Sequence, residues 1–370
     1  MNERERLLSV LKGKRPDKVP WYADLAYLYD SLRLKGQLED RFQGDAGYLE
    51  FHRELGAGIY LYAPDLWKQS HTQGTTYRED TRGDVRTCTF DTPIGTITSE
   101  HQYIPISTTW ACTKHYVESI DDLMVMLHVF EHSEYSENYD AFKRIDELWG
   151  EYGLPVALAP ISVSPLQKLF ARWAGVENTM ELYMEHEERF DEAIERIQVS
   201  EDRVFDILAA SPAEVIEFPE NLSSEITGRF FFEHYNLEYY RKRIRQLHDA
   251  GKIVSIHIDG TLKACLPLLR EAGFDIAEAV TPAPVGDVPI EALRDVAGDD
   301  IVLWGGLPGA LFSPVYSEDL FDAHLEKIME TFPLGSRFVL GVADQVPPDA
   351  LMHRVTKVRD VVERNGISSR

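Results

Sequence analysis

Short apolar stretches rich in β-branched residues recur along the chain, separated by longer segments whose apolar residues fall at helical spacing. The short stretches are typical of buried parallel strands, and the longer segments are typical of amphipathic helices. The predicted strands are residues 19–23, 59–63, 156–159, 214–218, 252–260, 274–278, 300–306 and 337–342. Alternation of strands and helices predicts an α/β fold, and eight such units predict a (β/α)8 TIM barrel.

Helices are expected between and around these strands. The predicted ranges are 3–11, 45–55, 177–210, 224–250, 262–272 and 348–364. A doubly wound sheet is the alternative fold, but it favours a glycine-rich turn after its first strand. Residues 20–25 hold no glycine, so the barrel is preferred.

Residues 76–150 interrupt the strand–helix alternation. Residues 76–104 alternate charged and β-prone side chains, which predicts a β-hairpin, and residues 120–150 are helix-rich. We therefore expect one barrel domain over residues 1–370, with a cap subdomain inserted after the second strand. Which of Trp110, Lys114 and His115 faces the pocket stays open.

Polar side chains follow the predicted strands at their C-terminal ends, which meet at one mouth in a barrel. The candidates for substrate binding are Tyr22, Asp65, Ser162, Asn221, Trp304 and Gln345. The candidates for catalytic chemistry are Asp24, Glu220 and Glu278. Simpler roles stay open, because serine and aspartate often cap helices and tryptophan often serves packing.

The fifth predicted strand ends in His257, Asp259 and Gly260, and the sixth ends in Glu278. A buried carboxylate without a partner is costly, so neighbouring strands are expected to place Glu278 beside His257. One imidazole and several carboxylates at neighbouring strand ends can bind a divalent cation, which makes His257, Asp259 and Glu278 candidate metal ligands. Without a metal, crowded carboxylates would raise one another's pKa and favour a general acid.

Composition narrows the function classes. The chain has 370 residues, is 44% hydrophobic and carries a formal net charge of −24, which disfavours nucleic acid as a partner. No apolar run approaches the ~20 residues of a membrane span, and the charged start of the chain does not resemble a signal peptide. Three cysteines without C-x-x-C spacing fit a cytoplasmic protein.

Several motifs occur in the order seen in one enzyme superfamily. They are Arg15-Pro-Asp-Lys-Val-Pro, Glu220-Asn-Leu-Ser-Ser, His257-Ile-Asp-Gly, Gly273-Phe-Asp-Ile, Pro284-Val-Gly-Asp, Trp304-Gly-Gly and Leu340-Gly-Val-Ala-Asp-Gln-Val-Pro. With them the chain resembles the uroporphyrinogen decarboxylase superfamily over nearly its whole length, and its corrinoid-dependent methyltransferase branch most closely. The resemblance implies a (β/α)8 barrel enzyme, which often forms a homodimer.

The chain departs from the decarboxylases of this superfamily after the first strand. Those enzymes bind a tetrapyrrole with many carboxylates through an Arg-Gln-Ala-Gly-Arg motif. The corresponding residues 22–27 are Tyr-Ala-Asp-Leu-Ala-Tyr, which cannot neutralise such a substrate. The resemblance therefore implies a methyltransferase acting between a small methylated substrate and a corrinoid carried by a partner protein.

The similar methyltransferases hold zinc with His-x-Cys and a later cysteine. His257 matches the histidine, Glu278 matches a glutamate ligand of the similar methionine synthases, and Asp259 takes the place of the first cysteine. Ala343 or Asp344 takes the place of the last cysteine, which leaves an oxygen-rich metal site or a metal-free pocket. A decarboxylase or lyase using Asp24 or Glu278 as proton donor, and a non-catalytic metabolite-binding barrel, are the alternatives.

Overall fold

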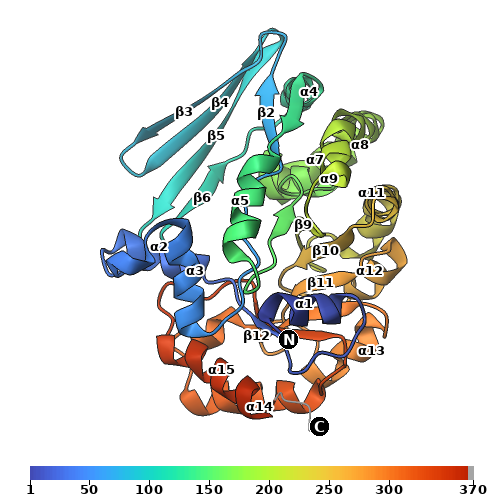
Figure 1. The fold of residues 1–370 in the computed structure, drawn as a ribbon. Coiled ribbons are helices and arrows are strands. Elements are labelled where there is room, and N and C mark those ends of the chain that lie inside the picture. The colour runs from blue at the N-terminus through green and yellow to red at the C-terminus, as the bar shows by residue number, and fades with distance from the viewer. Residues whose placement is uncertain (366–370) are drawn as a thin grey trace.

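A curved parallel sheet forms the centre of the computed structural model, which describes residues 1–365 (Figure 1). Its seven strands follow the order β1-β13-β12-β11-β10-β9-β8. The strands are β1 (Trp21–Tyr22), β8 (Val156–Leu158), β9 (Val215–Leu222), β10 (Ile253–Ile258), β11 (Ile276–Val280), β12 (Val302–Pro308) and β13 (Phe338–Ala343). Each neighbouring pair is parallel, as the buried apolar runs predict.

Residues 58–60 occupy the remaining position between β1 and β8. The Gly58 amide donates to the Trp21 carbonyl at 2.9 Å, and the Val156 amide donates to the Tyr60 carbonyl at 2.8 Å. This segment makes single bridges rather than a regular strand, because Tyr62 already turns away with φ 71°. It supplies the eighth barrel position, so the predicted (β/α)8 fold is confirmed, although the second strand is shorter than the predicted 59–63.

Glycine is needed at position 58 because two elements approach closely there. A Cβ on Gly58 would lie 2.4 Å from the Tyr22 ring. Tyr22 belongs to a core inside the barrel that also contains Trp304, Val215 and Val339. Leu7 of α1 (Glu3–Leu11) packs into the same core, so this helix closes the N-terminal end of the barrel.

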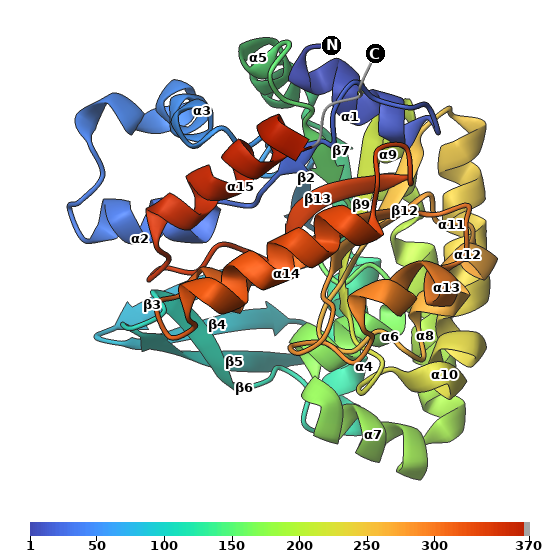
Figure 2. The same cartoon turned by 90° about the horizontal axis from the view of Figure 1, so that it is seen from below.

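Helices pack around the outside of the sheet (Figure 2). They are α2 (Ala26–Leu34), α3 (Gly44–Leu55), α9 (Asp202–Ala210), α11 (Leu237–Asp249), α12 (Leu266–Ala272), α13 (Leu293–Ala297), α14 (Glu318–Thr331) and α15 (Met352–Asn365). A second apolar cluster joins α6 (Pro165–Lys168), α7 (Gly175–Glu185), α8 (Glu187–Ser200) and α10 (Gly228–Phe231) to side chains of the inserted segment. Two π-helical segments, η2 (Leu169–Trp173) and η3 (Phe232–Asn236), follow α6 and α10. The predicted helix 177–210 is divided into three helices.

The segment between residues 60 and 156 forms a separate layer over one side of the barrel. A two-stranded ribbon joins β2 (Trp67–His71) to β7 (Ser133–Glu137), and helices α4 (Ile120–Glu131) and α5 (Tyr139–Trp149) flank it. The predicted hairpin is present and continues into a four-stranded antiparallel sheet that projects from the barrel (Figure 1). Its strands are β3 (Thr76–Arg82), β4 (Val85–Thr92), β5 (Gly95–Ile104) and β6 (Thr109–Lys114).

None of the helices within residues 1–365 combines the length and the apolar character that crossing a membrane requires.

Candidate active site

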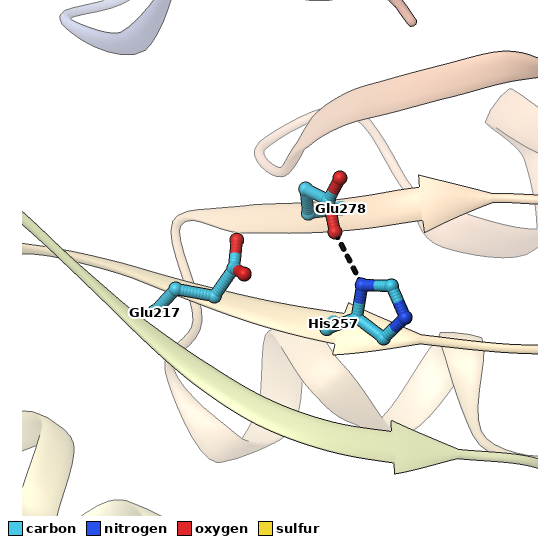
Figure 3. Close-up of side chains that lie close together, drawn as sticks. All are labelled: Glu217, His257 and Glu278. Atoms are coloured by element: carbon cyan, nitrogen blue, oxygen red, sulfur yellow. Dashed lines mark hydrogen bonds and ion pairs between the residues drawn. The ribbon is translucent and has the colours of Figure 1, made fainter. Parts of the chain in front are cut away.

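Three side chains from adjacent strands meet inside the barrel toward its C-terminal mouth (Figure 3). His257 of β10 lies in register with Glu278 of β11, and Glu217 of β9 lies in register with Ser255, two residues before His257. Side chains two residues apart on a strand share a face, so the register brings all three groups together. One ligand atom from each lies within 4.8 Å of the other two.

Glu278 is the centre of the hydrogen bonds in this group. Its Oε2 lies 2.6 Å from His257 Nδ1, and its Oε1 accepts a 2.7 Å hydrogen bond from the Tyr60 hydroxyl. The Tyr60 ring packs against Trp304 with the ring centroids 4.4 Å apart. Glu278 is 1% exposed, so its position is fixed by these contacts rather than by water. Glu217, equally buried, accepts a weaker 3.3 Å bond from Ser255.

A second set of side chains lies between this group and solvent. Asp24 is 3% exposed and accepts hydrogen bonds from the Tyr62 hydroxyl at 3.0 Å and the Ala26 amide at 2.9 Å. The Gln345 amide donates to the same Tyr62 hydroxyl at 3.2 Å. Asp344, whose side chain is half exposed, lies 4.0 Å from His257 Nε2. The mouth therefore holds several carboxylates around one imidazole.

Burial and mutual repulsion change the proton affinity of these acids. Burial, opposed by the Ala26 and Tyr62 hydrogen bonds, raises the pKa of Asp24 to about 7, and the charges of Asp344 and Glu278 contribute. Burial, together with the charge of Glu278, raises the pKa of Glu217 to about 8. Burial also raises the pKa of Asp344. At neutral pH this group of carboxylates therefore keeps protons that exposed acids would lose.

Burial and the neighbouring carboxylates act in opposite directions on the pKa of His257. Burial alone lowers the pKa of the imidazole, but the charge and hydrogen bond of Glu278, helped by Glu217 and Asp344, raise that pKa to about 10. A protonated His257 partly compensates the acids around it. More carboxyl groups than basic groups lie in the barrel mouth, and a cation bound there would displace the protons that these carboxyls keep.

The rim of the barrel is conformationally strained. Within residues 1–365, eight non-glycine residues have positive φ, and five of them follow or end barrel strands. The five are Tyr62, Ser162, Asn221, Ala279 and Asp344. Such backbone costs free energy and is tolerated where the surroundings impose it, often at functional sites.

Not all predicted site residues reach this group. The Tyr22 hydroxyl donates to the Glu3 carbonyl of α1 at 2.9 Å, so it points to the closed end of the barrel, away from the mouth. Trp304 is 1% exposed and packs between Tyr22 and Tyr60 in the barrel core. Both side chains lie in the barrel core on the N-terminal side of the site and are too deeply buried to contact a substrate.

Glu220 also lies apart from the mouth. Regular alternation along β9 places it on the outward face with Ile216 and Phe218, where its Oε1 accepts bonds from the Ser164 amide at 2.7 Å and the Tyr240 hydroxyl at 2.8 Å. It is completely buried between the barrel and its helices. Glu220 therefore lies apart from the side chains that meet in the barrel mouth.

The remaining candidates occupy the rim. Asp259 lies at the end of β10, and its charge raises the pKa of Asp344. Ser162 is buried, and its carbonyl accepts from Lys168, whereas Asn221 is exposed. Asp65 lies in the loop before β2. None of these four is among the three residues whose ligand atoms converge.

Three important side chains were not singled out from the sequence. Glu217 lies in a predicted strand, where its neighbours Ile216 and Phe218 face the outer core and Val215 faces the interior. This alternation was the available signal that Glu217 points into the barrel. Tyr60 and Tyr62 gave no comparable signal, because aromatic residues in a strand usually serve packing.

A comparison with family models decides the family of this chain. Residues 108–365, well over half of the 370-residue chain, match the model described as uroporphyrinogen decarboxylase (URO-D). The chain belongs to the uroporphyrinogen decarboxylase family. It matches no curated protein sequence.

Solved structures support the fold assigned to this family member. A methyltransferase from Methanosarcina mazei superposes with a TM-score of 0.62 at 16% identity, covering 98% of this chain and 99% of that chain. A 3-dehydroquinate dehydratase from Geobacillus kaustophilus gives a TM-score of 0.27 at 16% identity, covering 69% of this chain and 79% of that chain. The first likeness shows that the whole chain shares one fold with it; the second is too low to add to this.

This member of the uroporphyrinogen decarboxylase family has an acidic site at the position where a substrate rich in carboxylates would need cations. The loop after β1 presents Asp24, and Glu217, Glu278 and Asp344 face the same space. His257 is the basic group in contact with them. The main groups that shift the pKa values of Asp24, Glu217 and Asp344 include no arginine or lysine that would pair with several acetates.

Proposed function

We propose that the protein is a methyltransferase that moves a methyl group from a small methylated donor to a reduced corrinoid bound to a partner protein. The observation that carries the proposal is the convergence of His257, Glu278 and Glu217 in a buried, acidic barrel mouth. The likeness of the fold to a methyltransferase structure and the carboxyl groups gathered around His257 support this reaction over uroporphyrinogen decarboxylation.

A divalent cation suits this group of side chains. Imidazole and carboxylate oxygen are both ligands for zinc and other divalent metals, and two buried acids supply charge that a cation would compensate. His257, Glu278 and Glu217 would hold it, with Tyr60 orienting Glu278 as an outer hydrogen-bond partner. When bound, the cation would polarise the heteroatom that carries the methyl group. Replacing cysteine ligands with acids favours an oxygen-rich site.

The protein's own acids can manage the proton that the reaction needs. When the bond between the methyl carbon and its heteroatom breaks, the heteroatom keeps the electron pair and must take up a proton. The corrinoid supplies the electron pair for the new bond to the methyl carbon. Asp24, with its pKa raised to about 7, is protonated often enough at neutral pH to be that donor. The Tyr62 hydroxyl holds its carboxyl group in place.

The direct test is a methyl-transfer assay with purified protein, a panel of methoxyaromatic compounds and methylamines, and chemically reduced cob(I)alamin. Formation of methylcobalamin, followed by its absorption spectrum, is expected with at least one donor class. The His257→Ala variant should lose the activity while keeping the fold. Absence of transfer from every donor, with metal-loaded protein, would count against the proposal.

A proton-donating decarboxylase or lyase is the second candidate, because a buried Asp24 with a raised pKa would also serve to protonate a carbanion. This reaction needs no corrinoid. Release of carbon dioxide from a small carboxylic acid without cobalamin would favour it. An assay without cobalamin therefore distinguishes the two candidate functions.

A further inference from the structure

A pocket lies beside the barrel mouth, between the inserted layer and the third barrel strand. It is a cavity of about 250 Å³ bounded by the β2–β7 ribbon, the end of β8 and the segment α6–η2. None of Glu217, His257 and Glu278 lines it. The mechanism proposed above makes no use of this cavity.

Aromatic side chains from the ribbon and from η2 line the cavity. Trp67 and Tyr135 lie on the same face of the β2–β7 ribbon, because β7 pairs with β2 so that Tyr135 opposes Gln69, two residues after Trp67. Trp173 of η2 packs with Phe90 and Phe130, whose ring centroids lie 5.6 Å and 5.1 Å from its own. Flat apolar walls of this kind favour a planar aromatic ligand.

The two basic side chains that line the cavity differ in whether a carboxylate neutralises them. Lys168 Nζ lies 3.1 Å from Glu201 Oε1 and donates to the Ser162 carbonyl at 2.7 Å, so this fully buried pair is neutral overall. Arg172, one helical turn later, lines the cavity with no carboxylate of residues 1–365 at ion-pair distance. Its cation is therefore available beside the Trp173 ring.

The π-helical geometry of η2 explains this arrangement. A π-helical turn is an uncommon local distortion that is frequently retained at functional sites. Here the turn spans Leu169–Trp173 and brings both Arg172 and Trp173 to the cavity, directly after Lys168. A flat ring and an uncompensated cation are thus presented side by side by one short element.

We infer that this cavity binds a small planar aromatic carboxylate, with its ring between Trp67 and Trp173 and its carboxylate on Arg172. The guanidinium stays charged at all relevant pH values and can hold a carboxylate through two parallel hydrogen bonds. The site would accept such a ligand whether or not the barrel mouth transfers methyl groups.

An aromatic cation is the competing ligand, since Asp65 and Glu201 also line the cavity. Glu201 is already paired with Lys168, which leaves little charge for a ligand. Burial raises the pKa of Asp65, which favours its neutral form and weakens it as a partner for a cation. Arg172 is therefore the stronger charged anchor.

The test measures binding of benzoate, benzamide and benzylamine to the full chain by titration calorimetry and by quenching of tryptophan fluorescence. Benzoate is expected to bind about tenfold or more tightly than benzamide, and benzylamine most weakly. In Arg172→Gln the preference for benzoate over benzamide should disappear, because the amide lacks the charge that Arg172 recognises. Trp173→Phe should weaken both ligands.

Two controls make the outcome specific. Arg245→Gln removes an exposed arginine of α11 that does not line the cavity, and benzoate affinity should be unchanged. His257→Ala disables the barrel mouth and should also leave benzoate affinity unchanged, which separates this inference from the proposed reaction. Circular dichroism confirms that each variant is folded. Tighter binding of benzylamine, no saturable benzoate binding, or full benzoate affinity in Arg172→Gln would overturn the inference.

Discussion

Two groups of buried acids in this protein are compensated in different ways. Between the barrel and its helices, Glu201 pairs with Lys168 and Glu220 accepts bonds from the Ser164 amide and the Tyr240 hydroxyl. Inside the barrel, Glu217, Glu278 and Asp344 lie around one imidazole, that of His257. The acids of the first group have a lysine or hydrogen-bond donors beside them, whereas the acids of the second group also repel one another.

This difference shows why burial alone does not identify a functional acid. Glu201 and Glu217 are both about 1–2% exposed and both have raised pKa values because of burial. The neighbour of Glu201 is a lysine, whereas the neighbour of Glu217 is another glutamate, which raises its pKa further. An excess of like charge is costly and is therefore expected to be compensated by a ligand or used to hold a proton.

The largest expected effect is the loss of metal binding and activity when a residue of the interior group, inside the barrel, is replaced. His257→Ala and Glu278→Gln each remove a ligand, so metal affinity should fall by at least about 100-fold and methyl transfer should be lost. Glu220→Gln, in the exterior group, should leave the metal affinity within about twofold. Binding is measured by competition with a chromophoric chelator. Equal losses in Glu220→Gln would abolish the distinction between the two groups.

Substitutions in the exterior group, between the barrel and its helices, should instead lower the free energy of unfolding. Lys168→Met leaves Glu201 buried without its cation and should cost about 3 kcal/mol of unfolding free energy. The double variant Lys168→Met with Glu201→Gln should recover part of this loss. Lys242→Met, which breaks an exposed pair with Asp202, is the matched control and should cost less than about 1 kcal/mol. Urea denaturation gives all three values, and a cost for Lys168→Met no larger than that of the control would contradict the prediction.

A smaller effect is expected when the hydrogen bond that orients an interior ligand is removed. Tyr60→Phe keeps the ring against Trp304 but removes the donor to Glu278. Metal affinity should decrease about tenfold, as is typical for outer hydrogen-bond partners of metal ligands. The control Tyr240→Phe removes the corresponding donor to Glu220 and should not change metal affinity. Unchanged affinity in Tyr60→Phe would show that Glu278 needs no such orientation.

The pH dependence of stability should also distinguish the groups. The folded-state pKa values of Asp24, Glu217 and His257, about 7, 8 and 10, lie above the ordinary values of 3.8, 4.5 and 6.5. Each raised value contributes stability that is complete below the ordinary pKa and is lost as pH rises through the folded-state pKa. Metal-free protein should therefore lose stability between pH 5 and pH 10.

Thermal denaturation across this range tests the sign. Glu217→Gln should flatten the decline between about pH 4.5 and 8, the window set by the two pKa values of that residue. Glu225→Gln, which replaces an exposed acid, should leave the curve unchanged. If the stability of the metal-free protein rises with pH, the acids inside the barrel do not have the raised pKa values described here.

The smallest effect is expected at the rim. Asp344→Asn removes a charge that is half exposed and lies 4.0 Å from His257 Nε2. Solvent screens this interaction, so metal affinity should change by only a few fold. A loss as large as that of Glu278→Gln, measured in the same chelator competition, would make Asp344 a direct ligand as the sequence suggested.

The fold could be predicted from the sequence because strand type and order are encoded locally. Apolar runs such as 300–306 and 337–342 indicated buried parallel strands, and His257 and Glu278 could be placed together because they end adjacent strands. The face of each strand was harder to assign. Glu220 faces outward with Ile216 and Phe218, and Glu217 faces inward, a distinction that depends on which face of β9 lies inside the barrel.

The positions of Tyr22 and Trp304 were not predictable for a related reason. A barrel strand carries side chains at several depths, and their depth depends on strand tilt and stagger rather than on sequence position. The cavity beneath the inserted layer was also hidden, because Trp67, Tyr135 and Trp173 are distant in sequence and meet only through tertiary packing.

The most direct test of the account is the metal stoichiometry of the purified protein after equilibrium dialysis against zinc at pH 7.5. The interior excess of acids predicts about one ion per chain in the wild type and in Glu220→Gln. Glu217→Gln should bind more weakly, and His257→Ala should bind essentially none. No bound metal in the wild type, or one tightly bound ion that persists in His257→Ala, would contradict a cation site inside the barrel.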